Sequence, residues 1–595
     1  MLTGNDLIDF YSLMTEKKGA SEQSISDPND AIKSNQSERN PWANMFGGIP
    51  PEHIAKSFGE WLQCLGADTK KRQELEKKFQ QDITEFMDHA QAITGENQPS
   101  PLRQRRQFSG KEWQQWPYNI STQWYLMLDE WRETLFTDVK GLSDESESLV
   151  NFLSSQFYTS LSPYNYIHSN PEILARTVAE KGENLRRGMQ IAHEDRQNEL
   201  ENKPQISRQH RPGKEVAVTP GKVVYRNRLI ELIQYEPQTK DVSKNPVLIV
   251  PAWIMKYYIL DLSPHNSMVK YLVDQGHTVF AISWRNPTEE DRDIGMDDYL
   301  NLGLMKALDA VTTIVPDNKV QAVGYCIGGT LLSIGAAAMA RDGDDRLQSI
   351  TLLAAQTDFT EAGEIRLFIN EMQLQALDEM MASKGYLDSK QMGSSFMALR
   401  AEDLIWGPMV QKYLHGERPS LNDLMSWNSD GTRMPYRMHS EYLRRLYLNN
   451  DLAMGRFQVR GAPVDLANIR VPMFVVGTVT DHVAPWKSVF KIHHSTTNKE
   501  LTFLLTTGGH NAGIVSGPSH PRRSYQMLTR SNAKETLSPD TWLEQAPSIK
   551  GSWWPAWEQW LRTRSEGETA APTIGAQAKG YEPLCDAPGT YVLQS

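Results

Sequence analysis

Short, almost wholly apolar runs in the second half of the chain restrict its possible folds more than any other feature. They are PVLIV (246–250), TVFAIS (278–283), VQAVGY (320–325), SITLLA (349–354), VPMFVV (471–476) and LTFLLT (501–506). Runs of this length and composition suit β-strands that are buried on both faces. Helix-like stretches separate most of them, and this alternation predicts an α/β fold with a mostly parallel sheet flanked by helices.

The sequence before these runs has a different character. Residues 1–45 are polar and show no sustained apolar period, so we expect a disordered lead. Over residues 46–215 apolar side chains recur at intervals of three and four, as at Leu75, Phe79 and Ile83. This spacing predicts a helical N-terminal domain.

Residues 216–595 form the predicted catalytic domain. It opens with the alternating stretch VVYRNRLIELIQY, which is typical of a hairpin. Between about residues 358 and 460 the strand pattern stops, and a Met- and Trp-rich helical insertion follows. We expect this insertion to cap a site on the sheet, as insertions between late strands commonly do.

Charge and composition narrow the partners and the location. The net charge is -11 and the pI is about 5.8, with only short basic runs such as 103–106, which argues against nucleic-acid binding. No apolar run approaches the roughly 18 residues of a membrane-spanning helix, and MLTGNDLIDFYS lacks the features of a secretory signal. The expected location is therefore the cytoplasm.

The cysteines are too few and too scattered for a metal site or a disulfide framework. Cys64, Cys326 and Cys585 show no ligand-pair spacing, so each is interpreted as a thiol and no bound metal is expected.

One of these thiols lies in a motif with chemical meaning. GYCIGGT (324–330) places Cys326 in the frame Gly-x-nucleophile-x-Gly, after a predicted strand and before the small-residue helix TLLSIGAAAMA. Such a frame makes a tight turn that projects the central side chain and leaves the next backbone N–H free for an oxyanion. Glycines and a cysteine coincide often by chance, but the strand before and the helix after favour a nucleophile elbow. The first oxyanion donor would then be the N–H of Ile327.

An acid and a base follow in the order nucleophile, acid, base that this arrangement requires. Asp481 comes just after the run VPMFVV, and His510 comes just after LTFLLT and a Gly-Gly turn. His482 is the rival base, but it is adjacent to Asp481 and would point elsewhere if the aspartate faces the site. A second oxyanion donor is expected from the loop 251–256, where a backbone N–H near Trp253 to Met255 is the candidate and Ile254 is the middle residue of the three.

The thiol itself indicates the type of reaction. Transfer of an acyl group from a CoA thioester to Cys326 exchanges one thioester for another, so the acyl group stays activated for a hydroxyl acceptor. In this scheme His510 is the general base and Asp481 holds its tautomer. A cysteine hydrolase is also possible on these grounds.

Several stretches resemble class I polyhydroxyalkanoate synthases, which polymerise (R)-3-hydroxyacyl-CoA into storage polyester and release CoA. The resemblance begins near residue 110, and GYCIGGT resembles the family's lipase-like box, in which cysteine replaces serine. Further matching stretches are Trp253-Ile254 with KYYILDL (256–262), SWRNP (283–287), LRAEDLIW (399–406), WNSDGT (427–432), GSWWPAW (551–557) and APGTYV (587–592).

The resemblance implies an α/β-hydrolase fold and carries the family's triad onto Cys326, Asp481 and His510. It also implies that Trp253, Arg400 and Trp427 lie near the substrate channel, although Arg400 and Trp427 could equally only pack or pair within the cap. Short-chain substrates such as 3-hydroxybutyryl-CoA, a growing polyester chain and no cofactor beyond the CoA of the substrate are expected. The family further implies a homodimer at the surface of polyester granules, with granule-associated proteins as partners.

The sequence also departs from the family. Ala252 and Met255 stand where Pro and Asn are usual, and Asn511 stands where Ile is usual. Backbone donors survive such changes, so monomer preference and rate are more open than the activity. Two alternatives have the same fold, a thiol-dependent esterase or depolymerase and a non-catalytic granule-coating protein. The complete set of Cys326, Asp481 and His510 speaks against the second alternative.

Overall fold

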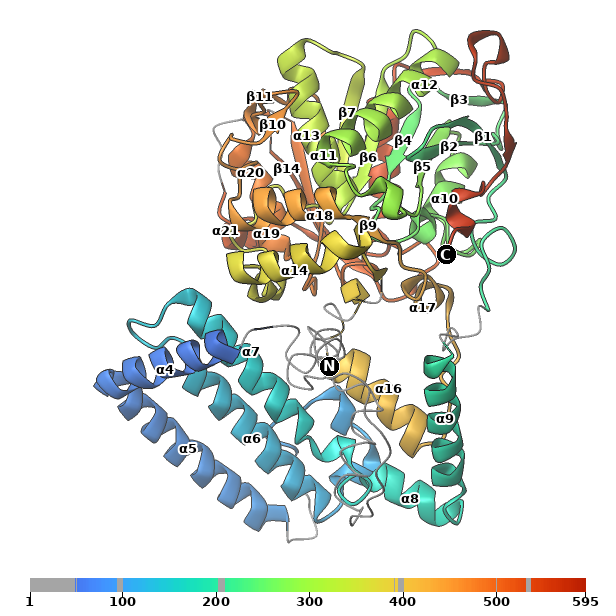
Figure 1. Ribbon diagram of the computed structural model, residues 1–595. Helices are drawn as coiled ribbons and strands as arrows, with labels where there is room; N and C mark the ends of the chain where they lie inside the picture. Colours follow the sequence, from blue (N-terminus) through green and yellow to red (C-terminus); the bar gives the residue numbers. More distant parts are fainter. Residues whose placement is uncertain are drawn as a thin grey trace, which may run out of the picture. The chain divides into compact units, whose positions relative to one another are not determined.

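The computed structural model describes residues 49, 51–93, 100–201, 209–389, 391–393, 397, 401–498, 500–530 and 537–595 (Figure 1). The chain forms two compact units, one within residues 1–207 and 394–420 and the other within 208–393 and 421–595. The lead predicted over residues 1–45 lies outside the described residues.

The first unit is helical. Four of its helices, α4 to α7, lie side by side in Figure 1, and aromatic side chains such as Phe79 and Trp131 (ring centroids 5.6 Å apart) pack between them. Ser143 caps α7 by accepting from the N–H of Ser146, and Asn170 caps α8. The helices are α4 (Pro51–Ala67), α5 (Thr69–Ile93), α6 (Tyr118–Phe136), α7 (Asp144–Ser160), α8 (Pro171–Ala179) and α9 (Glu183–Leu200), with short turns η1 (Arg106–Phe108), η2 (Lys111–Gln114) and η3 (Pro163–Asn165).

Residues 401–420 also belong to this unit, whereas the sequence analysis placed them in the cap insertion of the catalytic domain. The physical reason is a buried carboxylate on α9. Asp195 is paired with Arg418 at 2.7 Å and with Lys412 at 3.6 Å. The amide of Asn184 also donates to the carbonyl of Leu414 at 2.8 Å. This segment consists of η8 (Glu402–Trp406), α16 (Gly407–Met409) and η9 (Val410–Leu414).

The second unit is built on an eleven-stranded sheet of order β15-β14-β13-β12-β7-β6-β4-β5-β2-β1-β17. The central strands from β5 to β13 pair in parallel, and the pairs at both edges are antiparallel. The strands are β1 (Gly221–Arg226), β2 (Ile230–Tyr235), β4 (Val247–Val250), β5 (Val279–Trp284), β6 (Val320–Tyr325), β7 (Leu347–Leu353), β12 (Met473–Thr478), β13 (Leu501–Thr506), β14 (Ser524–Arg530), β15 (Ser548–Lys550) and β17 (Cys585–Asp586).

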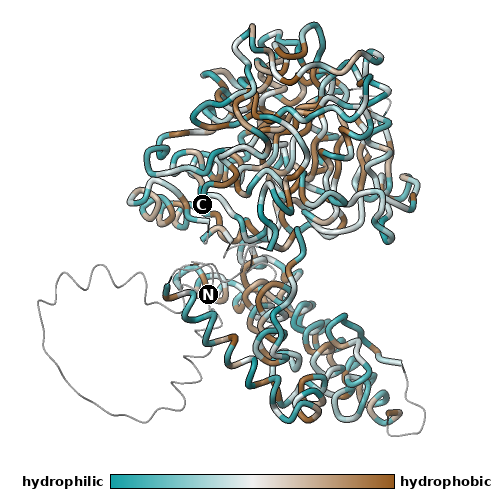
Figure 2. The backbone as a smooth tube through the Cα atoms, turned by 90° about the vertical axis from the view of Figure 1, so that its right-hand side faces the viewer, coloured by the Kyte–Doolittle hydropathy of each residue, from teal (hydrophilic) through white to brown (hydrophobic). Residues whose placement is uncertain are grey.

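The apolar runs of the sequence form the centre of this sheet. Every residue of β4, β5, β6, β12 and β13 is buried, and Figure 2 shows hydrophobic segments concentrated inside this unit. Burial on both faces removes the need for alternation, which is why the runs are continuously apolar. The predicted mostly parallel sheet is thus confirmed, and VVYRNRLIELIQY forms the antiparallel pair β1 and β2.

Helices cover the sheet and carry the remaining insertion. On one face, α22 packs closely: the indole N–H of Trp557 donates to the hydroxyl of Thr351 at 3.0 Å, and the amide of Gln321 donates to the carbonyl of Leu561 at 3.0 Å. The helices are α10 (Met268–Asp274), α11 (Met296–Asp298), η6 (Tyr299–Met305), α12 (Lys306–Ile314), α13 (Ile327–Asp342), α14 (Glu371–Lys384), α17 (Asp423–Asn428), α18 (Tyr436–Tyr442), η10 (Leu443–Leu448), α19 (Trp486–Phe490), α20 (Ile492–Ser495), α21 (Pro539–Gln545) and α22 (Trp554–Thr563). Short turns are η4 (Tyr257–Leu260), η5 (Glu289–Asp291), η7 (Glu364–Phe368), η11 (Leu466–Asn468), η12 (Gln577–Lys579) and η13 (Tyr591–Leu593), and small pairs join β3 (Asp241–Ser243) with β16 (Glu568–Ala570), β8 (Tyr386–Leu387) with β9 (Met434–Pro435), and β10 (Gln458–Val459) with β11 (Ala462–Pro463).

The topology determines where a site can form. Strands β6, β7, β12 and β13 are parallel neighbours, so the loops after their carboxyl ends meet at one edge of the sheet. Residues 326, 354, 479–481 and 507–510 follow these strands directly. Within the described ranges, no helix is long and apolar enough to cross a lipid bilayer.

Candidate active site

Cys326 lies on a sharp turn between β6 and α13. Its backbone has φ 54° and ψ -128°, a region that L-residues rarely adopt and that costs about 1–3 kcal/mol. The N–H of Cys326 donates to the carbonyl of Leu353 at the end of β7, at 2.8 Å, and this bond helps to hold the turn in place. The arrangement is that of the predicted elbow, with a half-buried thiol at its tip.

Glycines make this turn possible because neighbouring backbone comes too close for a side chain. A Cβ atom on Gly324 would lie 2.4 Å from the Cα of Gly329. A Cβ on Gly328 would lie 2.4 Å from the carbonyl oxygen of Val250 and 2.6 Å from that of Pro251. The start of α13 therefore packs directly against the loop that follows β4.

This close packing brings the two candidate oxyanion segments together. Ile327 is the first residue of α13, where backbone N–H groups have no partner within the helix. Thr432, which follows α17 in the sequence, holds the loop after β4. Its N–H donates to the carbonyl of Ile254 at 3.1 Å, and its hydroxyl donates to the carbonyl of Trp253. Thr432 thus fixes the peptide planes of this loop, while the donor role of Ile254 stays a prediction.

A second clamp on the same loop comes from residues far along the chain. The ammonium of Lys256 donates to the carbonyl of Gln594, and the side-chain oxygen of Gln594 accepts from the N–H of Asn286 at 3.1 Å. The side-chain oxygen of Asn286 in turn accepts from the N–H of Arg433 at 2.9 Å. The loop after β4 is therefore held from the cap side and from the C-terminal segment together.

Asp481 and His510 meet at the neighbouring strand ends. His510 Nδ1 lies 2.8 Å from Asp481 Oδ2, and both side chains are almost completely buried. Their loops are joined by a backbone bond from the N–H of Thr480 to the carbonyl of Gly508, at 3.0 Å. Gly508 has φ +114°, a conformation suited to glycine, which allows the turn before His510.

Hydrogen bonds fix the charge and orientation of Asp481. Its Oδ1 accepts from the N–H groups of Val483 (2.9 Å) and Ala484 (2.8 Å), and its Oδ2 accepts from the hydroxyl of Thr478 (2.9 Å). Burial works to raise the pKa of Asp481, but His510 and these hydrogen bonds outweigh it and lower the pKa. The carboxylate is therefore ionised, and His510 Nδ1 must be the donor of the shared hydrogen bond.

The charge state of His510 follows from its surroundings. Burial acts to lower its pKa, but the charges of Asp481 and Cys326 and hydrogen bonds to both raise the pKa well above its ordinary value. Since Nδ1 faces Asp481, Nε2 is the nitrogen available to Cys326. The structure thus brings Cys326, Asp481 and His510 together, and the imidazole whose Nδ1 is bonded to Asp481 Oδ2 is that of His510, the predicted base.

Two of the three residues predicted to lie near the substrate channel are among the described residues, and both are buried. Trp253 is buried, and its ring packs 4.5 Å from that of Tyr299. Trp427 is also buried, and its indole N–H donates to the carbonyl of Lys256 at 2.7 Å. Arg400 lies outside the described residues. The channel roles of these three residues stay predictions.

The sequence analysis missed a group of tyrosines around the thiol. The hydroxyl of Tyr325 donates to Asn511 Oδ1 at 2.5 Å, which links the residue before Cys326 to the residue after His510. Burial first, and then the charge of Cys326 among other causes, raises the pKa of Tyr325, Tyr442 and Tyr447. Tyr325 and Asn511 could have been noticed as the neighbours of two candidate residues, but Tyr442 and Tyr447 carried no motif.

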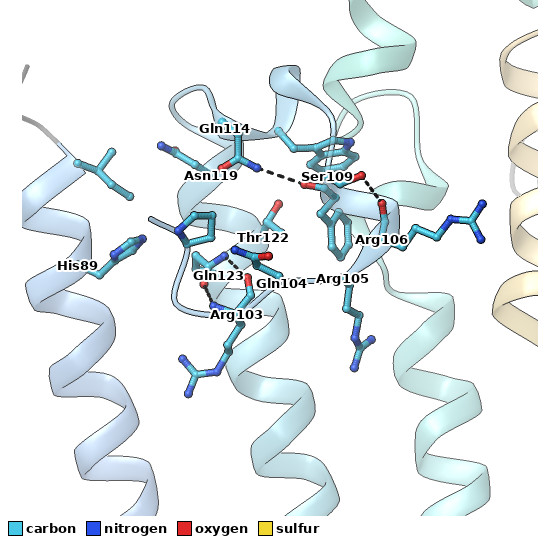
Figure 3. A pocket seen from close by; sticks show the side chains of 14 residues that line it. His89, Arg103, Gln104, Arg105, Arg106, Ser109, Gln114, Asn119, Thr122 and Gln123 are labelled. Carbon is cyan, nitrogen blue, oxygen red and sulfur yellow. Dashed lines mark hydrogen bonds between the residues drawn. The ribbon is translucent and has the colours of Figure 1, made fainter. Parts of the chain in front are cut away.

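A cavity of about 380 Å³ lies in the helical unit, but its chemistry is different (Figure 3). In the figure, the side chains of Arg103 and Arg105 point away from Gln114 and Asn119. Arg103 pairs with Asp82 at 3.1 Å, and Arg105 pairs with Asp129. Among the described residues that line the cavity there is no cysteine and no carboxylate, so it holds neither the thiol nor the carboxylate of the site around Cys326.

The sheet, the elbow and the Asp481–His510 pair define a protein of the α/β-hydrolase fold with cysteine at the nucleophile position, and the family described by that fold matches residues 245–516. The family described as poly-beta-hydroxybutyrate polymerase (PhaC) N-terminus matches residues 104–272. A poly(3-hydroxyalkanoate) polymerase of Methylorubrum extorquens is 37% identical over 560 residues, which are 93% of this chain and 92% of the relative. The chain therefore belongs to the poly(3-hydroxyalkanoate) polymerase family.

Two further similarities accompany this assignment. The poly(3-hydroxyalkanoate) polymerase subunit PhaC of Rhizobium meliloti is 38% identical over 494 residues, covering 82% of this chain and 80% of the relative. Among solved structures, a monoacylglycerol lipase of Paleococcus ferrophilus aligns with 56% of this chain and 99% of its own, at 13% identity and a TM-score of 0.30.

Proposed function

We propose that this protein is an acyltransferase that polymerises (R)-3-hydroxyacyl-CoA into polyhydroxyalkanoate through a thioester on Cys326. The observation that carries the proposal is the Asp481–His510 bond beside a cysteine elbow, in a chain of the polymerase family. The match to a poly-beta-hydroxybutyrate polymerase family supports short-chain substrates such as 3-hydroxybutyryl-CoA. Homodimer formation and association with the polyester granule stay predictions from the resemblance.

In the first half-reaction Cys326 takes the acyl group. An imidazolium beside a thiol favours the thiolate, whose sulfur attacks the thioester carbonyl. The carbonyl oxygen becomes an oxyanion, which the N–H groups of Ile327 and Ile254 stabilise. Collapse of this intermediate breaks the bond to CoA sulfur, and the leaving thiolate takes the proton from His510 Nε2.

In the second half-reaction the acyl group moves to oxygen. Neutral His510 now accepts the proton of a 3-hydroxyl group, whose oxygen attacks the thioester carbonyl on Cys326. Collapse forms the ester bond, expels the Cys326 thiolate and leaves His510 protonated for the next cycle. Asp481 keeps the Nδ1–H tautomer throughout, so Nε2 alone exchanges protons. The cycle requires no cofactor besides the CoA that arrives with the substrate.

One assay tests the reaction. The protein is incubated with (R)-3-hydroxybutyryl-CoA while free CoA thiol and insoluble polyester are both measured. We expect both products from the native protein and from the control Cys585→Ala, and neither from Cys326→Ala. Release of CoA with free hydroxy acid and no polymer would instead indicate a thiol-dependent esterase.

A second experiment tests the covalent step. Butyryl-CoA lacks the 3-hydroxyl group and cannot extend a chain, so it should leave the enzyme acylated. Intact-mass measurement should show one butyryl group on the native protein and on Cys585→Ala, and none on Cys326→Ala. Butyrylation that persists in Cys326→Ala would rule out Cys326 as the acceptor.

A further inference from the structure

The residues that flank the candidate nucleophile and base are bonded to each other. Tyr325 is the last residue of β6 and immediately precedes Cys326, and Asn511 immediately follows His510. The hydroxyl of Tyr325 donates to Asn511 Oδ1 at 2.5 Å. The two peptides that carry the reacting side chains are thus joined by a bond that involves neither Cys326 nor His510.

The Tyr325 side chain also contacts the base directly. Its ring centroid lies 5.6 Å from that of His510, with the planes inclined at 32°. Only 2% of Tyr325 is exposed, so loss of the acceptor on Asn511 would leave a buried hydroxyl without its hydrogen bond. The ring therefore packs beside the imidazole while the hydroxyl is tied to the residue after it.

Asn511 is itself well anchored. Its carbonyl accepts from the N–H of Val515 at 2.9 Å and from the N–H of Ile514 at 3.1 Å, which closes a helical turn. Its side-chain NH₂ lies 3.4 Å from Asn428 Oδ1, at the end of α17. A side chain fixed in this way fixes the turn that carries His510.

The hydrogen bond between His510 and Asp481 does not by itself fix the orientation of the imidazole ring. A single hydrogen bond at Nδ1 holds one side of the imidazole but still permits the ring to tilt about that contact. Nε2 lies on the far side of the ring, where a small tilt moves it most. We propose that Tyr325 and Asn511 form a staple that fixes the position of His510 Nε2 relative to the sulfur of Cys326, and that both are positioning residues. The inference rests on the proposed function.

A double-mutant cycle tests the staple. Tyr325→Phe leaves Asn511 Oδ1 without its donor, and Asn511→Leu leaves a buried hydroxyl without an acceptor. We expect each single variant to lower kcat about 10- to 100-fold with little change in KM, because misplaced reacting groups reduce the chemical step. In the double variant Tyr325→Phe/Asn511→Leu two apolar groups meet, so kcat should recover at least about tenfold over Asn511→Leu.

A matched control uses another tyrosine–asparagine pair in the same unit. The side-chain NH₂ of Asn227 donates to the hydroxyl of Tyr225 at 3.2 Å, and neither residue belongs to the site. Tyr225→Phe should leave kcat unchanged and should show no coupling to Asn511→Leu. If the effects of Tyr325→Phe and Asn511→Leu simply multiply in the double variant, or if both leave kcat unchanged, the staple is refuted.

A second readout needs no substrate. The rate at which iodoacetamide alkylates Cys326 at pH 6 reports the thiolate held by the imidazolium. We expect the alkylation rate to fall in both single variants and to recover in the double variant, with Cys326→Ala giving the background.

A native protein that makes no polymer would refute the proposed function, while the alkylation rates of these variants would still test the staple. If Asn511→Leu does not fold, Tyr325→Phe, which removes one oxygen, decides it by both readouts, with Tyr225→Phe as its control. An unchanged kcat and alkylation rate in that variant would refute the staple.

Discussion

The substitution Asp481→Asn tests the assigned roles most sharply, because the structure dictates how the new amide must lie. Asp481 Oδ1 accepts two backbone N–H groups, so the oxygen of the asparagine amide must occupy that position. Its NH₂ group then takes the place of Oδ2, 2.8 Å from His510 Nδ1. Two donors cannot face each other at this distance.

The histidine must respond by changing its tautomer. With a donor in front of it, Nδ1 becomes the acceptor and the proton moves to Nε2. Neutral His510 then presents N–H to the substrate hydroxyl and cannot remove its proton. Loss of the aspartate charge also lowers the pKa of His510, since that charge is one of the causes that raise it. Both effects act against catalysis at neutral pH.

We expect Asp481→Asn to lower kcat by about 10⁴-fold, the size seen when a triad histidine takes the wrong tautomer, which corresponds to about 5 kcal/mol. The assay is the initial rate of CoA release at saturating (R)-3-hydroxybutyryl-CoA. Asp261→Asn is the matched control, since Asp261 is also a buried carboxylate that accepts from hydroxyl groups, but those of Thr219 and Ser267. A loss below about tenfold in Asp481→Asn, or an equal loss in Asp261→Asn, would refute the tautomer argument.

Three other substitutions have expected outcomes. Cys326→Ser should lower the pKa of His510, because the charge and hydrogen bond of Cys326 help to raise that pKa. A raised histidine pKa contributes stability that is present below pH 6.5 and is lost as the pH rises through the folded-state pKa. In the variant this loss of stability should therefore occur at a lower pH. NMR titration of the imidazole measures the shift, and an unchanged titration contradicts it. Gly328→Ala should cost about 1–3 kcal/mol of unfolding free energy and lower kcat, because its Cβ would lie 2.4 Å from a backbone oxygen. The control Gly335→Ala in the same helix should cost less, because its Cβ would meet the ends of flexible leucine side chains. Urea unfolding that gives the reverse order of stability contradicts this prediction. Burial raises the pKa of Asp261 to about 6 from 3.8, so the folded protein binds the proton more tightly and stability falls as the pH rises through that window. Relative to the native protein, Asp261→Asn should gain stability as the pH rises from 3.8 to about 6 and keep the full gain of about 3 kcal/mol above that; a pH-independent difference contradicts it.

The sequence predicted the centre of the fold well, for a physical reason. Strands buried on both faces leave an unbroken apolar signal, and VQAVGY and LTFLLT coincide with β6 and β13 to the residue. Strands β14, β15 and β17 lie toward the sheet edges, carry more polar residues and were not predicted. The segment 401–420, which is helical up to Leu414, looked like part of the cap because its amphipathic pattern does not reveal which partner it packs against.

The candidate site shows the same division. Cys326, Asp481 and His510 could be found because strand ends and chain order restrict them to a few positions. The bond between Tyr325 and Asn511 depends on the tertiary approach of residues 186 positions apart, which no local pattern reports. The contact of Gln594 with Lys256 is of the same kind.

That last contact has a consequence for the timing of enzyme biogenesis. Lys256 and Gln594 are 338 residues apart, so at about 5–20 residues per second roughly 17 to 70 s separate their synthesis. Cys326 and His510 leave the ribosome within this interval, while the loop with Ile254 still lacks the clamp that Gln594 provides. We expect chains stalled before residue 594 to be acylated by butyryl-CoA more slowly than chains in which Gln594 has emerged. Polyester should then start to grow faster on chains whose C-terminal segment has already docked than on chains in which it has not.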